Sequence, residues 1–309
     1  MTDTVLAPAK TRAQTQPRVG ARRFRRWWKN PWRKPRFLEA ITWGYLAWSI
    51  LPVLIAILLS FNRGRSRSTW QGFSLRWWTG DPFDSLWHDP ELHSALLQSL
   101  RLSGMTMLIA VPLGVLFAIG IDRWRGRGSG TANFVMLLSF VIPEIILGIA
   151  IFLVLRFLLT FVHLGTTAQV LGLVSYQLSY PVIIVRARLL SIGREYEEAA
   201  MDLGASPTRA LRRVLLPLLY PAIFASFAIV FADSIDDFVT VRYLSGPSSS
   251  EPLSVKIYNQ ARGDPTPAVN AAATAMLISA IIAIVIGLLL YRWLARGQRA
   301  GVQEFAAQV

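Results

Sequence analysis

The chain has 309 residues, of which 53% are hydrophobic and only 16% are charged, and its mean hydropathy is +0.42. Because a soluble domain usually carries about a quarter charged residues, this composition argues against an ordinary soluble protein. The absence of cysteine excludes disulfide frameworks, thiol catalysis and cysteine zinc sites. A formal net charge of +14 can indicate nucleic-acid binding, but basic residues also gather on the cytoplasmic side of membrane proteins, and we expect no nucleic-acid partner.

The N-terminal segment, residues 1–42, is polar and strongly basic and holds the stretch "RRFRRWWKNPWRKPRF". This basic tract is too long, and too far from the first apolar run, for a cleavable signal peptide. We expect a cytoplasmic tail whose Trp- and Arg-rich part lies on the inner membrane surface, against lipid headgroups. The first apolar run, residues 43–61, is then an uncleaved signal anchor.

Six apolar runs are long enough to cross a bilayer as helices, since a span needs about 20 apolar residues. They predict an all-α, polytopic membrane protein with a transmembrane domain over residues 43–295 and a cytoplasmic tail over residues 296–309. The predicted spans are residues 43–61, 95–121, 133–159, 167–190, 218–237 and 269–293.

The fourth run is the most polar of the six, because it contains Gln169, Tyr176, Gln177 and Tyr180. Polar side chains on a spanning helix normally face protein or water rather than lipid. The fourth run therefore predicts a helix that lines a pathway.

Lysine and arginine counts predict the orientation of the spans. With six spans, the two tails and the segments after the second and fourth spans lie on one side of the membrane, and together they hold 23 lysine and arginine residues. The three loops on the other side hold 7. Positive residues concentrate on the cytoplasmic side of a membrane. Both termini and the segment after the fourth span are therefore predicted to be cytoplasmic.

That segment reads "EEAAMDLGASPTRALRRVLLP" over residues 197–217. Helix formers fill its first half, Gly204 suits the left-handed residue that ends a helix, and Ser206 followed by Pro207 begins a second helix. Pro217 is expected to mark the junction with the fifth span. The pattern predicts two short helices joined at a tight bend, which protrude from the membrane as a compact body. An amphipathic hairpin resting on lipid headgroups is the alternative.

The same segment resembles the EAA loop of ABC-importer permeases. The similar residues are Glu198-Ala199-Ala200, Gly204, Val214 and Leu216-Pro217, with valine in place of the usual isoleucine. The resemblance implies the type I ABC importer permease fold, in which this cytoplasmic helical loop, at about residues 191–217, docks into a groove on a separate ATPase. It assigns ATPase coupling to Glu198, Ala199, Ala200, Asp202, Gly204 and Pro217.

The chain has no GxxxxGK[ST] phosphate loop. ATP and Mg²⁺ are therefore expected on the partner ATPase, while this chain is expected to hold no cofactor and to be no enzyme. Its three histidines show no HExxH spacing and fall in predicted loops, which argues against an intramembrane metalloenzyme, and we expect no metal site. They are His88, His93 and His163.

Most of residues 40–295 resembles, more narrowly, the second permease subunit of spermidine/putrescine importers. The similar stretches are "WQGFSLRWW", "EEAAMDLGAS", "SIDDFVTVRYLSGPSSSEPLSVKIYNQAR" and "TPAVNAAATAML". The resemblance implies a subunit of an ATP-driven polyamine importer in the bacterial inner membrane, where this chain forms half of the translocation pathway. Implied partners are a homologous second permease, two ATPase subunits and an extracytoplasmic polyamine-binding protein.

Acidic residues within or beside the predicted spans fit a cationic cargo. They are Glu144, Asp233, Asp236 and Asp237. An acidic residue costs about 2.5–3.5 kcal/mol near the centre of a span and marks a functional site by default. Tyr176 and Tyr180 would add cation–π contacts of about 0.5–2 kcal/mol. We assign these six residues to the substrate pathway and favour Asp236 and Asp237, although Asp236 is turned by about 100° from Asp237 and cannot face the pathway equally.

Several alternatives stay open. The aspartates could form a solvated helix end, and Glu144, which a continuous third span places near the membrane midplane at a depth of about 17 Å, could hydrogen-bond a helix kinked at Pro143. Another cationic or amine-bearing solute, such as an opine or an amino-acid derivative, is the alternative cargo. A channel or receptor subunit outside the ABC class is a more remote one.

Overall fold

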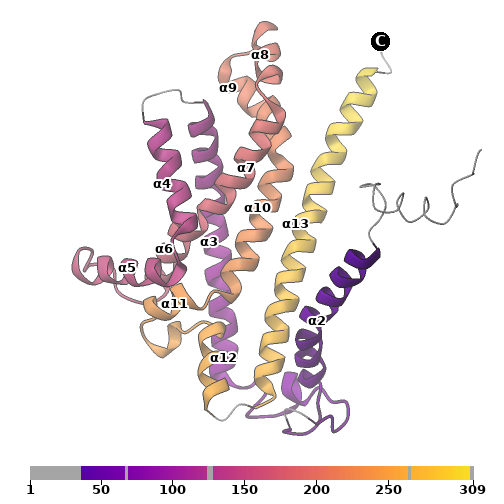
Figure 1. The fold of residues 1–309 in the computed structure, drawn as a ribbon, viewed down its shortest axis with the longest axis vertical. Helices are drawn as coiled ribbons and strands as arrows, with labels where there is room; N and C mark the ends of the chain where they lie inside the picture. The colour runs from indigo at the N-terminus through magenta and orange to yellow at the C-terminus, as the bar shows by residue number, and fades with distance from the viewer. Residues whose placement is uncertain (1–35, 67–68, 124–127, 264–265, 307–309) are drawn as a thin grey trace, which may run out of the picture. The chain divides into compact units, whose positions relative to one another are not determined.

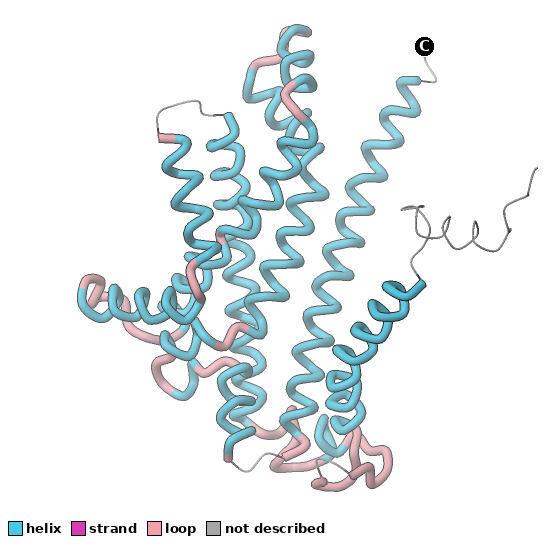
Figure 2. Tube along the Cα trace, viewed as in Figure 1, coloured by secondary structure: helices cyan, strands magenta, loops and turns pink. Residues whose placement is uncertain are grey.

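The computed structural model describes residues 36–66, 69–123, 128–263 and 266–306. Within these ranges the regular elements are helices joined by short loops, and the only β pairing is an isolated bridge (Figure 2). The all-α fold is therefore confirmed. The chain divides into two compact units, Met1–Val53 and Leu54–Val309, and the packing described below belongs to the second.

Five helical segments are long and apolar enough to cross a membrane, which matches five of the six predicted spans. They are α2 (Arg36–Ser60), α3 (Pro90–Arg123), Thr166–Ile192, Pro207–Asp236 and Ala268–Trp293. The chain is thus a multi-pass membrane protein. α2 begins inside the segment predicted as a basic tail, and the rest of that prediction falls on residues 1–35, outside the described residues.

The third predicted span is wrong as a single helix, because the structure divides it into α4 (Ser129–Val141) and α5 (Glu144–Phe157). Ile142 and Pro143 between them each have a ψ of 130°. A residue before proline is pushed out of the α region, and proline lacks the N–H that would continue the helix. Figure 1 shows α5 lying across the direction of α3 and α4. Glu144 therefore begins a helix instead of sitting in the middle of a continuous span.

Two of the spanning segments are composite. α6 (Thr166–Gln177) is followed after one residue by α7 (Ser179–Ile192). In the other, α9 (Pro207–Ala210), the π-helical turn η2 (Leu211–Leu215) and α10 (Leu216–Asp236) follow without a break. Pro217 lies in the first turn of α10, where the sequence predicts the junction with the fifth span. The helical path continues through this proline, and the π-helical turn directly before it is where regular hydrogen bonding changes.

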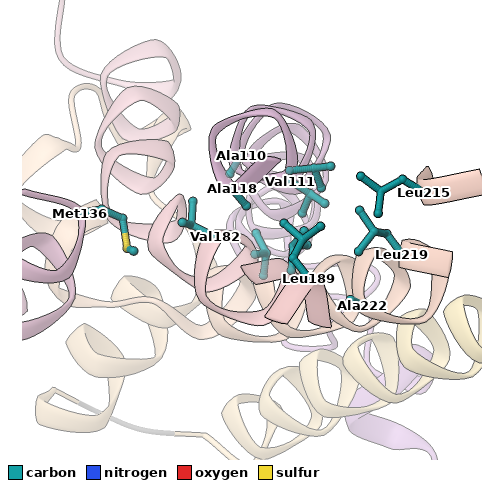
Figure 3. Packing of buried hydrophobic residues seen from close by; sticks show 12 residues of the cluster. Ala110, Val111, Ala118, Met136, Val182, Leu189, Leu215, Leu219 and Ala222 are labelled. Carbon is teal, nitrogen blue, oxygen red and sulfur yellow. The ribbon is translucent and has the colours of Figure 1, made fainter. Parts of the chain in front are cut away.

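The larger hydrophobic core lies between α3, α7 and α10, with one contribution from α4 (Figure 3). Its fully buried members include Ala110 and Val111 on α3, Val182 and Leu189 on α7, and Leu219 on α10. The helices α3 and α7 cross closely at Gly114. A Cβ added there would lie 2.5 Å from Cγ of Pro181, so no larger residue fits at this crossing without a shift.

A second core lies toward the end of α3 that begins at Pro90. It joins α3 to α12 (Leu253–Arg262), to α13 (Ala268–Ala306) and to the π-helical turn η1 (Arg76–Gly80) around the fully buried Trp77. The Trp77 Nε1–H donates to the carbonyl of Asn62 at 2.7 Å and ties the preceding loop to this core. Because α13 continues to Ala306, most of the predicted tail over residues 296–309 is helical.

A buried polar network joins α3 and α6 to α11 (Val239–Leu244) and the turn η3 (Ser248–Ser250). The Oε1 atom of Gln169 accepts from Gln98 Nε2 at 3.1 Å. The Nε2 atom of Gln169 donates to Ser245 Oγ and to the carbonyl of Ser250, both at 3.0 Å. Buried amides need such partners, so the network fixes where the segment after α10 lies.

Replacing Gln169 by leucine is expected to lower the thermal stability of the detergent-solubilised protein by several degrees. Leucine has a similar volume but leaves the Ser250 carbonyl without its donor, and an unsatisfied buried group costs about 1–3 kcal/mol. Thermal unfolding followed by tryptophan fluorescence measures the effect. Ser175→Ala is the matched control, because Ser175 is exposed on the same helix. Equal midpoints for Gln169→Leu and the wild type would contradict the role of the network.

Candidate coupling loop and substrate pathway

The segment after α7 forms the two short helices that the sequence predicts. They are α8 (Glu195–Asp202) and α9, and Figure 1 places them at the end of the bundle opposite α12. Gly204 joins them with a φ of +86°. Its N–H donates to the carbonyl of Met201 at 2.9 Å, and the N–H of Ala205 donates to the carbonyl of Ala200 at 3.0 Å. This pair of bonds is a Schellman motif, which favours glycine at the position of Gly204.

The start of α9 also follows the prediction in its backbone. The carbonyl of Ser206 accepts from the N–H groups of Arg209 at 2.8 Å and Ala210 at 2.9 Å. Pro207 occupies the first helical position, where an N–H would have no intrahelical partner. The side chain of Ser206, however, makes no capping bond, and its hydroxyl lies 3.3 Å from that of Thr208.

The surface of α8 and the following bend combines small, acidic and apolar side chains. Of the predicted coupling residues, those exposed or partly exposed here are Glu198, Ala199, Ala200, Asp202 and Gly204. Leu203 is 91% exposed and Tyr196 is 57% exposed. The sequence reasoning missed both, although large apolar residues in a polar segment were the available signal. Pro217 lies apart, partly buried at the start of α10. Apolar side chains exposed on a compact protrusion suit a protein partner.

The six side chains predicted for the pathway gather where α5, α6, α7 and α10 meet. They are Glu144 at the start of α5, Tyr176 on α6, Tyr180 on α7, Asp233 and Asp236 on α10, and Asp237 directly after it. The other four all interact electrostatically with both Asp233 and Glu144. Asp233 and Glu144 are therefore the centre of the cluster, although the sequence favoured Asp236 and Asp237.

Asp233 has a buried partner that the sequence reasoning did not assign to the site. Gln177 is fully buried, and its Nε2 donates to Asp233 Oδ2 at 2.6 Å. The Oε1 atom of Gln177 is buried without a hydrogen-bond partner among the described residues. The polarity of the fourth apolar run indicated that Gln177 faces protein or water rather than lipid. Its pairing with Asp233 could not be predicted, because the two residues are 56 positions apart in the sequence and no spacing rule links them.

The two aspartates at the end of α10 differ in their surroundings. Asp237 is only 8% exposed, its Oδ1 accepts from the N–H of Val241 at 3.1 Å, and its carbonyl accepts from Ser254 Oγ at 2.6 Å. Its carboxyl group also faces that of Glu144. Asp236 is exposed. Because neighbouring carboxylates repel each other, a cation bound beside Glu144 and Asp237 would relieve this repulsion.

Aromatic rings border the acidic cluster. The rings of Tyr176 and Tyr180 meet edge to face at 6.1 Å between centroids, and Tyr180 meets Phe140 in the same manner at 5.8 Å. Ring faces attract ammonium groups, by about 0.5–2 kcal/mol each. Carboxylates beside aromatic rings in an apolar setting therefore suit an organic cation.

The loop between α2 and α3 is organised by Asp81. Its Oδ1 accepts from the N–H groups of Phe83 and Asp84 at 3.1 and 3.0 Å, and its Oδ2 accepts from Arg76 Nε at 2.9 Å. The N–H of Asp84, followed by the Arg76 side chain and the N–H of Phe83, lowers the pKa of Asp81 from 3.8 to about 2. The charged carboxylate thus stabilises this loop at neutral pH.

Asp81→Asn is expected to speed amide hydrogen exchange in the loop between α2 and α3 at pH 7. A lowered folded-state pKa contributes stability above the unfolded pKa, and this contribution is lost as the pH falls through the folded pKa. The ratio of variant to wild-type exchange rates should therefore approach one as the pH falls from about 4 to about 2. A ratio that stays constant over that range would contradict this role of the Asp81 charge.

The fold defines a class: a polytopic α-helical membrane protein with two short helices protruding at one end and a cluster of acidic and tyrosine side chains between its helices. Residues 110–300 match the family described as "Binding-protein-dependent transport system inner membrane component", and the chain belongs to that family. Family membership makes it a component of a transport system rather than an enzyme.

Two relatives and one solved structure show how far the similarity extends. The chain is 31% identical over 267 residues to the spermidine/putrescine transport system permease protein PotC of Escherichia coli (strain K12), covering 86% of this chain and 97% of PotC. It is 30% identical to the putrescine transport system permease protein PotI of the same organism, covering 89% and 95%. A chain of a bacterial ABC transporter involved in the import of the acidic polysaccharide alginate matches with a TM-score of 0.65 at 18% identity, covering 88% and 98%. This last match shows the shared fold alone.

Proposed function

We propose that this chain is a permease subunit of an ATP-driven ABC importer for polyamines and forms half of the translocation pathway. The observation that carries the proposal is the cluster around Asp233 and Glu144, where four carboxyl groups and two tyrosines gather among apolar helices. Polyamines carry two or more ammonium groups on methylene stems, which this combination of charge, rings and apolar surface complements. The names of PotC and PotI as polyamine permeases support the same cargo.

The partners follow from the loop and the family. The α8–α9 loop docks on a separate ATPase, which holds the ATP and Mg²⁺, and a homologous second permease completes the pathway. An extracytoplasmic polyamine-binding protein delivers the cargo. An alginate transporter of this fold has been solved in complex with a periplasmic protein bound to a pentasaccharide, which supports a delivery step of this kind.

In the proposed cycle, ATP binding draws the α8–α9 loops of the two permeases together and opens the pathway outward, and hydrolysis returns it inward. The spans rock around a fixed site because the two states bind the ATPase and the cargo differently. The carboxylates bind the polyamine only transiently, since a deep site would trap it.

The membrane is the bacterial inner membrane, and both termini lie in the cytoplasm. The excess of lysine and arginine on one side of the spans supports this orientation. Figure 1 adds that α8 and the C-terminal end of α13 lie at the same end of the bundle. A coupling loop and a C-terminus on one side of the membrane agree with that arrangement.

Complementation of a strain that lacks this chain tests the proposed function. Wild-type protein is expected to restore uptake of radiolabelled spermidine, and excess unlabelled putrescine should compete with it. Unlabelled amino acids or opines should not compete at equal concentration. Restored uptake of an amino-acid derivative but not of spermidine, with the partner subunits present, would replace the cargo and keep the importer.

A further inference from the structure

The coupling helix α8 is joined to its neighbours at both ends by glycines with positive φ. Gly193 before it has a φ of +74°, and Gly204 after it has a φ of +86°. Glycine is the residue that adopts these conformations at little cost, and no atom lies within 4 Å of an added Cβ at either position. The backbone alone therefore gives α8 two points at which its direction can change.

Side chains tie α8 to a different helix. Glu197 in the first turn of α8 forms an ion pair with Arg123 at the end of α3, across 74 positions of sequence. Arg123 also pairs with Asp122, and Arg194, just before α8, donates to the carbonyl of Asp122 at 2.5 Å. The side chains of Arg123 and Glu197 are only 23% and 15% exposed. Removing Arg123 would leave the enclosed Glu197 carboxylate without its ion-pair partner, unlike the loss of an ordinary surface pair. Removing Glu197 would leave Arg123 paired with Asp122 alone and would release α8 from this contact.

α3, the helix that carries Arg123, runs along the length of the bundle. α3 packs along both α7 and α10. Near its other end, Ser99 Oγ accepts from the N–H of Leu253 at 2.9 Å, and the adjoining Ser254 donates to the carbonyl of Asp237. α3 therefore contacts the coupling helix at one end and a neighbour of the acidic cluster at the other.

We propose that the Arg123–Glu197 ion pair fastens α8 to α3, so that a displacement of α8 by the ATPase moves α3 instead of bending the chain at its two glycines. Arg123 and Glu197 are positioning residues in this account, because neither needs to touch the ATPase or the cargo. The proposal rests on the proposed function, since it requires that the α8–α9 loop receives the motion of an ATPase.

A charge swap in the assembled transporter tests the pair. Arg123→Glu and Glu197→Arg are each expected to lower ATP-dependent spermidine uptake in proteoliposomes by about tenfold or more, with the ATPase still co-purifying. The double variant, which restores an ion pair of reversed polarity, is expected to recover most of the uptake. Glu195→Arg is the matched control, because Glu195 lies in the same turn of α8 and is exposed.

Each other outcome contradicts the proposal. A double variant no better than the worse single variant would mean that the two residues act separately, for example through direct contact of Glu197 with the ATPase. An equal loss from Glu195→Arg would assign the effect to the surface charge of α8. Single variants with wild-type uptake would mean that the pair transmits nothing.

A second measurement needs no cargo. It therefore tests the role of the Arg123–Glu197 ion pair even if the transported solute is not a polyamine. The chain has no cysteine, so spin labels can be placed at Glu195→Cys on α8 and Leu116→Cys on α3, both exposed. Their separation should be the same without nucleotide and with ATP plus vanadate in the wild-type background and in the swap. It should differ between the two states in Glu197→Arg. A constant separation in that single variant would overturn the proposal even if spermidine is the cargo.

Discussion

Gly204→Val is expected to reduce polyamine uptake by about tenfold or more while the chain still inserts and accumulates in the membrane. Gly204 has a φ of +86°, and its N–H closes the Schellman end of α8. A β-branched residue is a strong outlier at such a φ, and the left-handed conformation costs an ordinary residue about 1–2 kcal/mol. The bend would therefore relax to a negative φ and turn α8 away from its direction relative to α9. Uptake and co-purification of the ATPase measure the two consequences.

Gly204→Asn is the control for the backbone argument. Asparagine visits the left-handed region more readily than other residues, and an added Cβ meets no atom within 4 Å. This variant should keep at least half of the wild-type uptake. If Asn and Val reduce uptake equally, bulk at the docking surface rather than the backbone of Gly204 decides coupling. Normal uptake by Gly204→Val would show that the bend is not needed.

Asp233→Asn is expected to have the largest effect of any single neutralisation in the acidic cluster, again about tenfold or more on spermidine uptake, equal to about 1.4 kcal/mol. Asparagine keeps an oxygen that can accept from Gln177 Nε2, so the change removes the charge and preserves the contact. Asp233 is central because Tyr176, Tyr180, Asp236 and Asp237 all interact with it. Initial uptake rates over a range of spermidine concentrations measure the loss.

Asp236→Asn and Asp84→Asn complete that series. Asp236 is exposed at the margin of the cluster and should have a smaller effect than Asp233. Asp84 pairs with Arg65 in the loop between α2 and α3, away from the cluster, and should have almost none. If Asp236→Asn lowers spermidine uptake more than Asp233→Asn does, Asp236 matters more than Asp233, as the sequence favoured. That result would contradict the central position of Asp233 in the cluster.

Local signals in the sequence predicted much of this structure correctly. The bend at Gly204 and the start of α9 at Pro207 depend on a few neighbouring residues, so backbone preferences were enough to locate them. The apolar runs located five spanning segments for the same reason. The third span failed because both halves of residues 133–159 are apolar, and hydropathy does not distinguish a helix that kinks at Pro143 from one that ends there.

Contacts between distant residues could not be predicted in the same way. The sequence showed that Gln177 and Glu197 were polar, but not that Asp233 and Arg123 are their partners, because those pairings depend on how α3, α6, α8 and α10 pack. The sequence could not show which of the acidic residues lies at the centre of the cluster, for a related reason. Helical periodicity relates Asp233, Asp236 and Asp237 to one another, but the position of Glu144 depends on the direction of α5 after the break.

ATP-dependent accumulation of labelled spermidine in proteoliposomes tests most directly whether this chain is a polyamine permease whose pathway depends on Asp233. The vesicles would contain this chain with its partner permease and ATPase, and the binding protein would be added outside. Spermidine is expected to accumulate with ATP inside and not without ATP, and accumulation is expected to be lost when Asp233→Asn replaces the wild-type chain at equal assembly. Equal accumulation by Asp233→Asn, or ATP-driven accumulation of another solute with none of spermidine, would contradict this expectation.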